Sequence, residues 1–318
     1  NLIGIYLKDR CRLNKRRNIM KRKLIYILLC LLIFSQPVLA NDLSNENYVK
    51  VAIIDTGIST KAINAERIIE GYNYINKNND TEDIIGHGTA IAGVIAGLSY
   101  AGLSEASSSI KLVPLVFQTM DEDGKMQRGN SEMIARAIRD AIDKYGCRVI
   151  NLSVGTTYES KLLSEAVEYA EEKNAVIISS VGNKNIKDSD SLYFPAAYPT
   201  VIGVGSVNKN GRVSYFSQRN RSLMLVAPGE RIWTISKNGK ALLTSGTSFA
   251  AAFVSAAAAE LLSMCPGLTA ADVRDILCQS ATDILEPGYD TDSGWGILNL
   301  DKALTFTLED KDFLYSVP

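Results

Sequence analysis

The chain has 318 residues, of which 46% are apolar and 22% charged, so it can form a sizeable core and is neither disordered nor collagen-like. Its formal net charge of −1 combines two unlike parts, because residues 1–23 contain nine of the 34 basic residues and one of the 35 acids. The remaining 25 basic and 34 acidic residues give the rest of the chain a charge near −9. An acidic body without a basic stripe repels phosphate backbones, so we expect no nucleic-acid partner.

Residues 20–40 have the layout of a secretory signal peptide. Basic residues at 21–23 precede an apolar run over 24–34, and a Ser-Gln-Pro breaker precedes Val38-Leu39-Ala40. The alternative is an uncleaved membrane anchor, but 11 apolar residues are fewer than the roughly 20 that a spanning helix needs. We expect cleavage near Ala40, a secreted or extracytoplasmic protein, and no membrane span after cleavage.

The rest of the chain consists of a short segment before the signal peptide and a long segment after it. Residues 1–19 precede Met20, where a signal peptide would begin, and are interpreted as an upstream, non-native extension. Residues 41–318 contain no Pro/Gly linker, internal repeat or low-complexity tract between 48 and 304, which favours a single domain. We expect this domain to act as a monomer.

Apolar, β-branched runs alternate with segments of helical periodicity. The runs predict strands at 49–54, 110–117, 149–154, 175–181, 201–207 and 223–226. Helices are predicted at 89–98, 131–145, 160–173, 249–264 and 269–279. This βαβ series predicts a three-layer α/β fold, a mostly parallel sheet with helices on both faces. A Rossmann-type sheet shares the pattern, so the fold class alone does not identify the chemistry.

Three of the five cysteines lie beyond the expected signal peptide, at Cys147, Cys265 and Cys278. A disulfide between Cys265 and Cys278 is conceivable in an exported protein, whereas separate buried thiols are the simpler interpretation. Their spacing matches no metal-binding pattern, and we assign them no function.

Two residues near the start of the domain are candidates for proton transfer. Asp55 ends the first predicted strand, where ligand crevices form in open α/β sheets, although many such residues only cap a turn. His87 is the only histidine in the chain, which excludes sites built from two or three histidines. It opens a predicted helix, and we expect the flanking Gly86 and Gly88 to leave room for a substrate backbone.

Two later segments add a candidate nucleophile and a hydrogen-bond donor. Ser248, in Gly-Thr-Ser-Phe-Ala, stands where the Ala-rich helix begins, and free backbone N–H groups there favour developing negative charge. The alternative is an ordinary helix-capping serine. Asn183 follows an apolar strand in Val-Gly-Asn, which is typical of a turn, but its side-chain amide could donate to an oxyanion.

The four segments around Asp55, His87, Asn183 and Ser248, taken in this order, indicate a particular protein family much more specifically than any one of them does alone. From about residue 48 to 304, including Ser293-Gly294-Trp295-Gly296 and Asn299, the chain resembles the subtilisin-like serine proteases, the subtilases of peptidase family S8. The order Asp, His, Ser along the chain is the one established for subtilisin. The resemblance implies a secreted serine endopeptidase that hydrolyses peptide bonds of peptide or protein substrates through an acyl-enzyme, without a cofactor.

The resemblance also assigns roles to matching residues. It implies that Ser248 is the nucleophile, His87 the general base and then acid, and Asp55 the residue that orients the imidazole. It implies an oxyanion hole from Asn183 with the Ser248 backbone amide. It further implies a substrate-binding set at Ser153, Val154, Gly155, Ser180, Gly182, Lys184 and Tyr193.

Within that set, the resemblance places Tyr193 at the base of the pocket for the side chain before the cleaved bond. A ring there would shorten the pocket, and Lys184 near its mouth would favour small or acidic side chains over large aromatic ones. The alternative is a Tyr193 that swings out to solvent and a Lys184 that is only a solvated loop charge.

The chain departs from the family pattern in three respects. Only about eight residues separate the expected cleavage site from the first strand, which leaves no room for a folding propeptide. Ala90 replaces the usual histidine three residues after His87. The segment 97–102 contains no carboxylate and looks shorter than the family's calcium loop, so we expect no calcium site there and no other metal.

Two other classes of protein compete with a subtilase. An α/β-hydrolase esterase needs a Gly-x-Ser-x-Gly elbow and the order Ser, acid, His, but here Ala250 takes the last position of the motif and His87 precedes Ser248. A catalytically silent, subtilase-like extracellular regulator or binding protein would be expected to have lost a catalytic residue, and all four are present.

Overall fold

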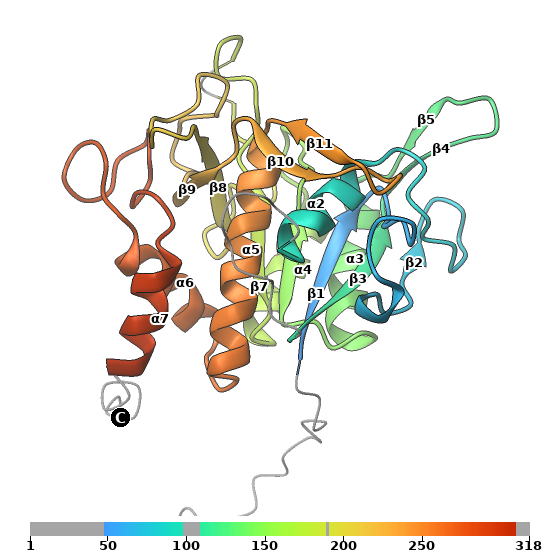
Figure 1. The fold of residues 1–318 in the computed structure, drawn as a ribbon, viewed down its shortest axis with the longest axis horizontal. Coiled ribbons are helices and arrows are strands. Elements are labelled where there is room, and N and C mark those ends of the chain that lie inside the picture. The colour runs from blue at the N-terminus through green and yellow to red at the C-terminus, as the bar shows by residue number, and fades with distance from the viewer. Residues whose placement is uncertain (1–47, 98–108, 189–190, 310–318) are drawn as a thin grey trace, which may run out of the picture. The chain divides into compact units, whose positions relative to one another are not determined.

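The computed structural model describes residues 48–97, 109–188 and 191–309, which are coloured in Figure 1. The expected extension at 1–19 and signal peptide at 20–40 lie outside the described residues, as does most of the expected calcium loop, at 98–102. These three expectations therefore remain predictions. The described residues group into one compact unit.

A seven-stranded sheet with only parallel pairings organises this unit. Its order is β2-β3-β1-β6-β7-β8-β9. The strands are β1 (Val49–Asp55), β2 (Tyr72–Asn73), β3 (Ile110–Val116), β6 (Val149–Leu152), β7 (Val176–Ser180), β8 (Ile202–Val207) and β9 (Leu225–Pro228). The central strands are buried on both faces because alternate side chains enter two different cores. In β1, Val51 and Ile53 pack into one core and Ala52 and Ile54 into the other.

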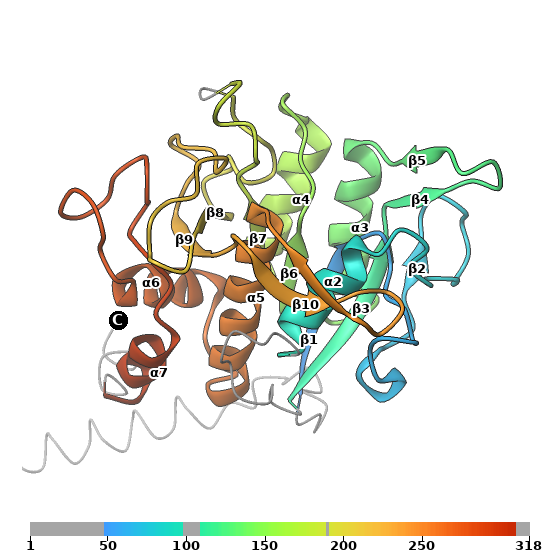
Figure 2. The ribbon, with the colours of Figure 1, turned by 45° about the horizontal axis from the view of Figure 1, so that its top comes forward.

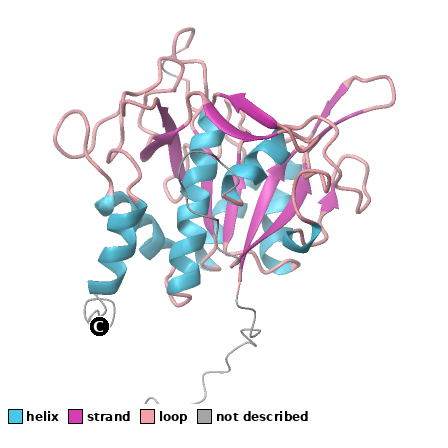
Figure 3. Ribbon diagram, viewed as in Figure 1, coloured by secondary structure: helices cyan, strands magenta, loops and turns pink. Residues whose placement is uncertain are grey.

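Helices cover both faces of this sheet, which confirms the predicted three-layer α/β fold (Figures 1, 2 and 3). The helices are α2 (His87–Ile95), α3 (Ser131–Asp143), α4 (Lys161–Glu172), α5 (Thr247–Met264), α6 (Ala270–Ser280) and α7 (Leu300–Glu309). Residues of α2, α5 and α6 share one core, and residues of α3 and α4 share the other. The two faces are therefore covered by different helices, as the βαβ pattern requires.

Several elements differ from the sequence-based prediction. The strand expected at 149–154 ends at Leu152, because pairing with β1 and β7 stops there and Ser153 and Val154 leave the sheet. The hairpins β4 (Gln118–Met120) with β5 (Met126–Arg128) and β10 (Ile232–Ile235) with β11 (Ala241–Thr244) were not predicted. The 3-10 turn η1 (Ala65–Arg67), strand β2 and helix α7 were also missed, since each is short or lacks clear periodicity.

Helix α5 is the long, apolar helix expected from the sequence. It is the one helix in the described part of the chain that is long and apolar enough to cross a membrane, and 78% of it is buried inside the fold. Its alanines, such as Ala250, Ala251 and Ala258, are fully buried and let the helix approach the sheet closely. The apolar composition of α5 thus serves the core.

The three cysteines in the described residues carry free thiols. Cys147 is buried and Cys265 and Cys278 are half-buried. The simpler sequence interpretation, separate buried thiols, is therefore correct for the absence of a disulfide among these residues, but only Cys147 is fully buried.

A buried polar contact joins α5 to the sheet below it. Ser255 Oγ of α5 donates to Asn151 Oδ1 of β6 at 3.0 Å, and both residues are fully buried. Asn151 Nδ2 in turn donates to Ser153 Oγ at 3.2 Å, and Ser153 Oγ donates to the Ser248 carbonyl at 3.4 Å. This chain of bonds connects the middle of the sheet with the first turn of α5.

We predict that Ser255→Ala destabilises the protein by about 1 to 3 kcal/mol, because it leaves the buried Asn151 Oδ1 without a donor. Urea unfolding measures the change in the free energy of unfolding. Ser263→Ala, on the half-buried end of the same helix, is the control and should change stability by less than about 0.5 kcal/mol. Equal effects of the two substitutions would contradict a special role for the buried contact.

Candidate active site

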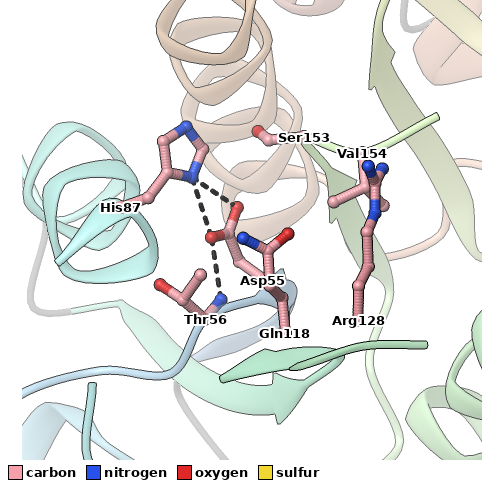
Figure 4. Close-up of a pocket in the computed structure, with 7 residues that line it drawn as sticks. All are labelled: Asp55, Thr56, His87, Gln118, Arg128, Ser153 and Val154. Carbon is pink, nitrogen blue, oxygen red and sulfur yellow. Dashed lines mark hydrogen bonds and ion pairs between the residues drawn. The ribbon is translucent and has the colours of Figure 1, made fainter. Parts of the chain in front are cut away.

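Asp55 is a buried carboxylate at the carboxyl end of β1, an interior strand of the sheet. It is 1% exposed, and its Oδ1 accepts a hydrogen bond from Thr56 N at 2.8 Å. His87 Nδ1 lies 2.8 Å from Asp55 Oδ1 and 3.0 Å from Oδ2 (Figure 4). A buried carboxylate requires such donors, so His87 is the main partner of Asp55.

This contact determines the protonation pattern of His87. A carboxylate only accepts, so the proton of the neutral ring sits on Nδ1 and Nε2 carries the free lone pair. The side chain is 37% exposed, so the ring remains accessible from the cavity that it lines. The negative charge of Asp55 raises the pKa of His87; burial opposes this rise, and the Asp55 hydrogen bond and the charge of Asp83 add to it.

Asp83 holds the start of α2 and was not singled out from the sequence. It is buried, and its Oδ1 accepts from Ile85 N at 3.0 Å and Gly86 N at 2.7 Å. Its Oδ2 accepts from Thr89 N at 2.8 Å and Thr89 Oγ1 at 2.7 Å. These bonds satisfy backbone donors on both sides of His87, and the carboxylate suits the positive end of the helix. The sequence signal that could have identified Asp83 is its position three residues before Gly86, the N-cap of α2.

Gly88 serves the packing of the fold and does not leave room for a substrate, which corrects the sequence-based expectation for this residue. A Cβ on Gly88 would lie 2.3 Å from the Gly57 carbonyl oxygen, because α2 touches the loop after β1 there. Gly88 N also donates to Thr56 Oγ1 at 2.8 Å. Gly86 has a φ of 111°, which side chains rarely adopt.

Ser248 lies in the first turn of α5, as predicted, and is 8% exposed. Gly246 precedes the helix with a φ of 158° and has no side chain of its own to cap this end. Phe249 N donates to the Gly246 carbonyl at 3.1 Å, whereas the N–H groups before it have no acceptor inside the helix. The Phe249 ring lies 5.8 Å from the His87 ring, centroid to centroid, which brings the starts of α2 and α5 together.

Asn183 follows β7 and faces the same helix end. Its Oδ1 accepts from Thr247 N at 2.9 Å and from Thr247 Oγ1 at 3.0 Å. Since a backbone N–H can only donate, the atom that it meets is the amide oxygen, and the Nδ2 group is left to donate elsewhere.

Two adjoining cavities bring these residues into one cleft. The smaller, of about 300 Å³, is lined by Asp55, Thr56, His87 and Gln118, with Arg128 and Val154 on the side opposite His87 (Figure 4). The larger, of about 560 Å³, is lined by Ser248 and Asn183. Both cavities share Arg128, Ser153 and Val154. The larger one also contains the whole substrate-binding set expected from the sequence: Ser153, Val154, Gly155, Ser180, Gly182, Lys184 and Tyr193.

Tyr193 is half-buried at the larger cavity, and its hydroxyl is shielded from solvent. The alternative in which this ring swings outward is therefore wrong. Lys184 is exposed on the cavity wall directly after Asn183.

Comparisons with known proteins agree with this arrangement. The sequence model of the Subtilase family, Peptidase S8, matches residues 46–296. Subtilisin DY of Bacillus licheniformis is 31% identical over 257 residues, which cover 80% of this chain and 90% of that protein. The cell wall-associated protease of Bacillus subtilis is 33% identical over 285 residues, and the match spans 81% of this chain but only 31% of that longer protein.

Solved structures show the same relationship. The crystal structure of a lanthipeptide protease has a TM-score of 0.70 and 28% identity, and the match covers 81% of this chain and 87% of that one. On the family match and these relatives, the chain belongs to the subtilase family and is a serine peptidase that acts on peptide or protein substrates.

Proposed function

We propose that this subtilase is an extracytoplasmic serine endopeptidase whose nucleophile is Ser248, with His87 as proton acceptor and Asp55 as its orienting partner. The observation that carries the proposal is the hydrogen bond between His87 Nδ1 and Asp55, at one end of a cleft that also holds Ser248 and Asn183. The bond leaves His87 Nε2 with a free lone pair for a proton from a hydroxyl.

The chemistry follows from these atoms. Ser248 Oγ attacks the substrate carbonyl carbon and gives its proton to His87 Nε2, and the new imidazolium is stabilised by Asp55. Asn183 Nδ2 and the Ser248 backbone N–H donate to the oxyanion that forms. His87 then protonates the leaving amine, and water hydrolyses the acyl-enzyme by the reverse sequence of proton transfers.

The segment Ser153, Val154 and Gly155 is proposed to hold the substrate backbone. It continues β6 beyond the last sheet pairing and lines both cavities at Ser153 and Val154. Its backbone at Ser153 and Val154 is proposed to pair with an extended peptide, a β-augmentation. An extended substrate on this segment would lie along the cleft that His87 and Ser248 line.

The location and biological role rest on similarity. The expected signal peptide at 20–40 and the name of the cell wall-associated relative support an extracytoplasmic location. The likeness to a lanthipeptide protease supports a second candidate role, the dedicated cleavage of a lanthipeptide, beside general protein digestion. A catalytically silent binding protein is disfavoured because Asp55, His87, Asn183 and Ser248 are all present.

We predict that Ser248→Ala, His87→Ala and Asp55→Ala each abolish most peptide hydrolysis while the protein stays folded, because the three residues act as a unit. Steady-state hydrolysis of a peptide library measures activity, and circular dichroism checks the fold. The losses should not add in a double variant. A folded Ser248→Ala protein with unchanged turnover would contradict the proposal.

Asn183→Ala should have a milder effect than loss of Ser248. It removes one oxyanion donor, which is worth about 3 kcal/mol of transition-state stabilisation or roughly a hundredfold in kcat. KM should change little, because the donor acts mainly on the transition state. Full activity of this variant would show that Asn183 is not an oxyanion donor.

The pH dependence should follow the raised pKa of His87. Only the neutral ring accepts a proton, so kcat/KM should rise with pH through a pKa above the ordinary value of about 6.5. Since the sole histidine gives a single imidazole signal, NMR titration measures the same pKa directly. Asp55→Asn should lower it; a wild-type value below 6.5 would contradict the role of Asp55.

The raised pKa of His87 makes the stability of the fold fall with rising pH, whereas it makes kcat/KM rise. A pKa that is raised in the folded state stabilises the fold below the unfolded value of about 6.5, and this contribution is lost as pH rises through the folded-state pKa. Activity should therefore increase over the pH range in which this part of the stability disappears.

Asp83→Asn tests the residue that positions α2. An amide group facing Gly86 N, Ile85 N and Thr89 N leaves at least one buried donor unmatched, which should cost about 1 to 3 kcal/mol of stability and lower kcat. Because the Asp83 charge also raises the pKa of His87, the acid limb of kcat/KM should move to lower pH. Thr89→Val, which removes one hydroxyl and no charge, should lose stability without moving that limb.

A further inference from the structure

The larger cavity adjoins both Ser248 and Asn183. If these residues attack a peptide carbonyl, the side chain of the residue that carries this carbonyl must enter the same cavity. The chemistry of the cavity wall then determines which residue the enzyme cleaves after. This inference rests on the proposed function and concerns its substrate.

The Tyr193 ring is part of the cavity wall and packs tightly against its neighbours. A Cβ on Gly182 would lie 2.8 Å from the ring, and one on Gly155 would lie 3.3 Å from Tyr193 Cβ, so the ring is in close contact with both walls. The walls are themselves held in place. Thr156 and Phe194 exchange two backbone hydrogen bonds at 2.9 and 2.8 Å, and Gln218 N donates to the Gly182 carbonyl at 3.0 Å. A large aromatic side chain would have to displace a ring that is fixed on both sides.

The charges on the cavity wall are all of one sign. Arg128 and Lys184 line it, and no Asp or Glu is among the described residues that do. Arg128 Nη2 donates to the Gly155 carbonyl at 3.3 Å, and neither cation forms an ion pair with a described carboxylate. Asp55 belongs to the adjoining cavity, where it accepts a hydrogen bond from His87. The larger cavity therefore has two cations whose charge is uncompensated within the described structure.

We propose that the enzyme prefers an acidic side chain, Asp or Glu, in the residue immediately before the cleaved bond. The cations attract a carboxylate and repel Lys and Arg, and hydroxyl and amide groups of Asn130, Ser180 and Thr156 on the wall provide further polar contacts. The Tyr193 ring disfavours Phe, Tyr and Trp by size. The same cavity therefore also disfavours basic and aromatic residues immediately before the cleaved bond.

The test uses the full chain and five peptides that are identical except for Glu, Gln, Ala, Phe or Lys before one scissile bond. Mass spectrometry of the products verifies where each peptide is cut. Glu and Gln differ in charge but hardly in size, so their ratio of kcat/KM isolates the charge effect. We expect Glu to exceed Gln by about fivefold or more, since each exposed ion pair contributes up to about fivefold. Lys and Phe should be slowest, and the Glu to Gln ratio should shrink as salt is raised.

Variants then locate the source of the preference. Lys184→Gln and Arg128→Gln should each lower the Glu to Gln ratio severalfold. Lys187→Gln is the matched control, because this exposed lysine lies in the same loop but not on the cavity, and it should leave the ratio unchanged. Tyr193→Gly should raise hydrolysis of the Phe peptide relative to the Ala peptide.

Failure of this inference can be told apart from failure of the proposed function. Hydrolysis of all peptides with Lys or Phe fastest, or a Glu to Gln ratio near one, would overturn the acidic preference and leave the peptidase intact. Absence of hydrolysis of any peptide would overturn the proposed function. Binding of the same peptides to Ser248→Ala, measured by calorimetry, tests the preference without turnover. Equal affinity for the Glu and Gln peptides would overturn it there as well.

Discussion

The hydrogen bond between Asp55 and His87 is the interaction on which the site depends. Asp55 ends β1, an interior strand of the sheet, and is almost completely buried, so its charge needs donors close by. Thr56 N supplies one and His87 Nδ1 the other. The same carboxylate thereby fixes the tautomer of the imidazole and raises its pKa.

The surrounding fold fixes the position of Asp55 and His87 relative to the other residues of the cleft. Asp83 binds the backbone on both sides of His87, and Gly88 allows α2 to touch the loop after β1. Helix α5 is attached to the sheet through Ser255 and Asn151, which places Ser248 beside the segment that follows β6. Parallel strands end at one edge of the sheet, so residues far apart in sequence meet in one cleft there.

Much of this could be predicted from the sequence, for reasons that are physical. The central strands are continuous apolar runs because both faces are buried, and the long α5 helix is recognisable by its apolar, alanine-rich composition. Because the chain has a single histidine, His87 is the only imidazole that can transfer a proton. Helix starts at His87 and near Ser248 followed from glycine and small polar residues at the expected positions.

Other features depend on tertiary contacts that no local pattern reveals. Asp83 lies in a polar segment, and its role follows from four donors that meet only after α2 has formed. Gly88 was interpreted as room for a substrate, whereas the space beside it is filled by the Gly57 carbonyl. The end of β6 at Leu152 is set by its neighbouring strands, not by the apolar character of Val154.

The most direct test of the central claim is to locate the covalent adduct of a fluorophosphonate probe, which reacts only with an activated hydroxyl. Mass spectrometry of the digested protein identifies the labelled residue. The account predicts one adduct, on Ser248, which is lost in Ser248→Ala and forms far more slowly in His87→Ala. Labelling of another serine, or labelling of Ser248 at the same rate without His87, would contradict it.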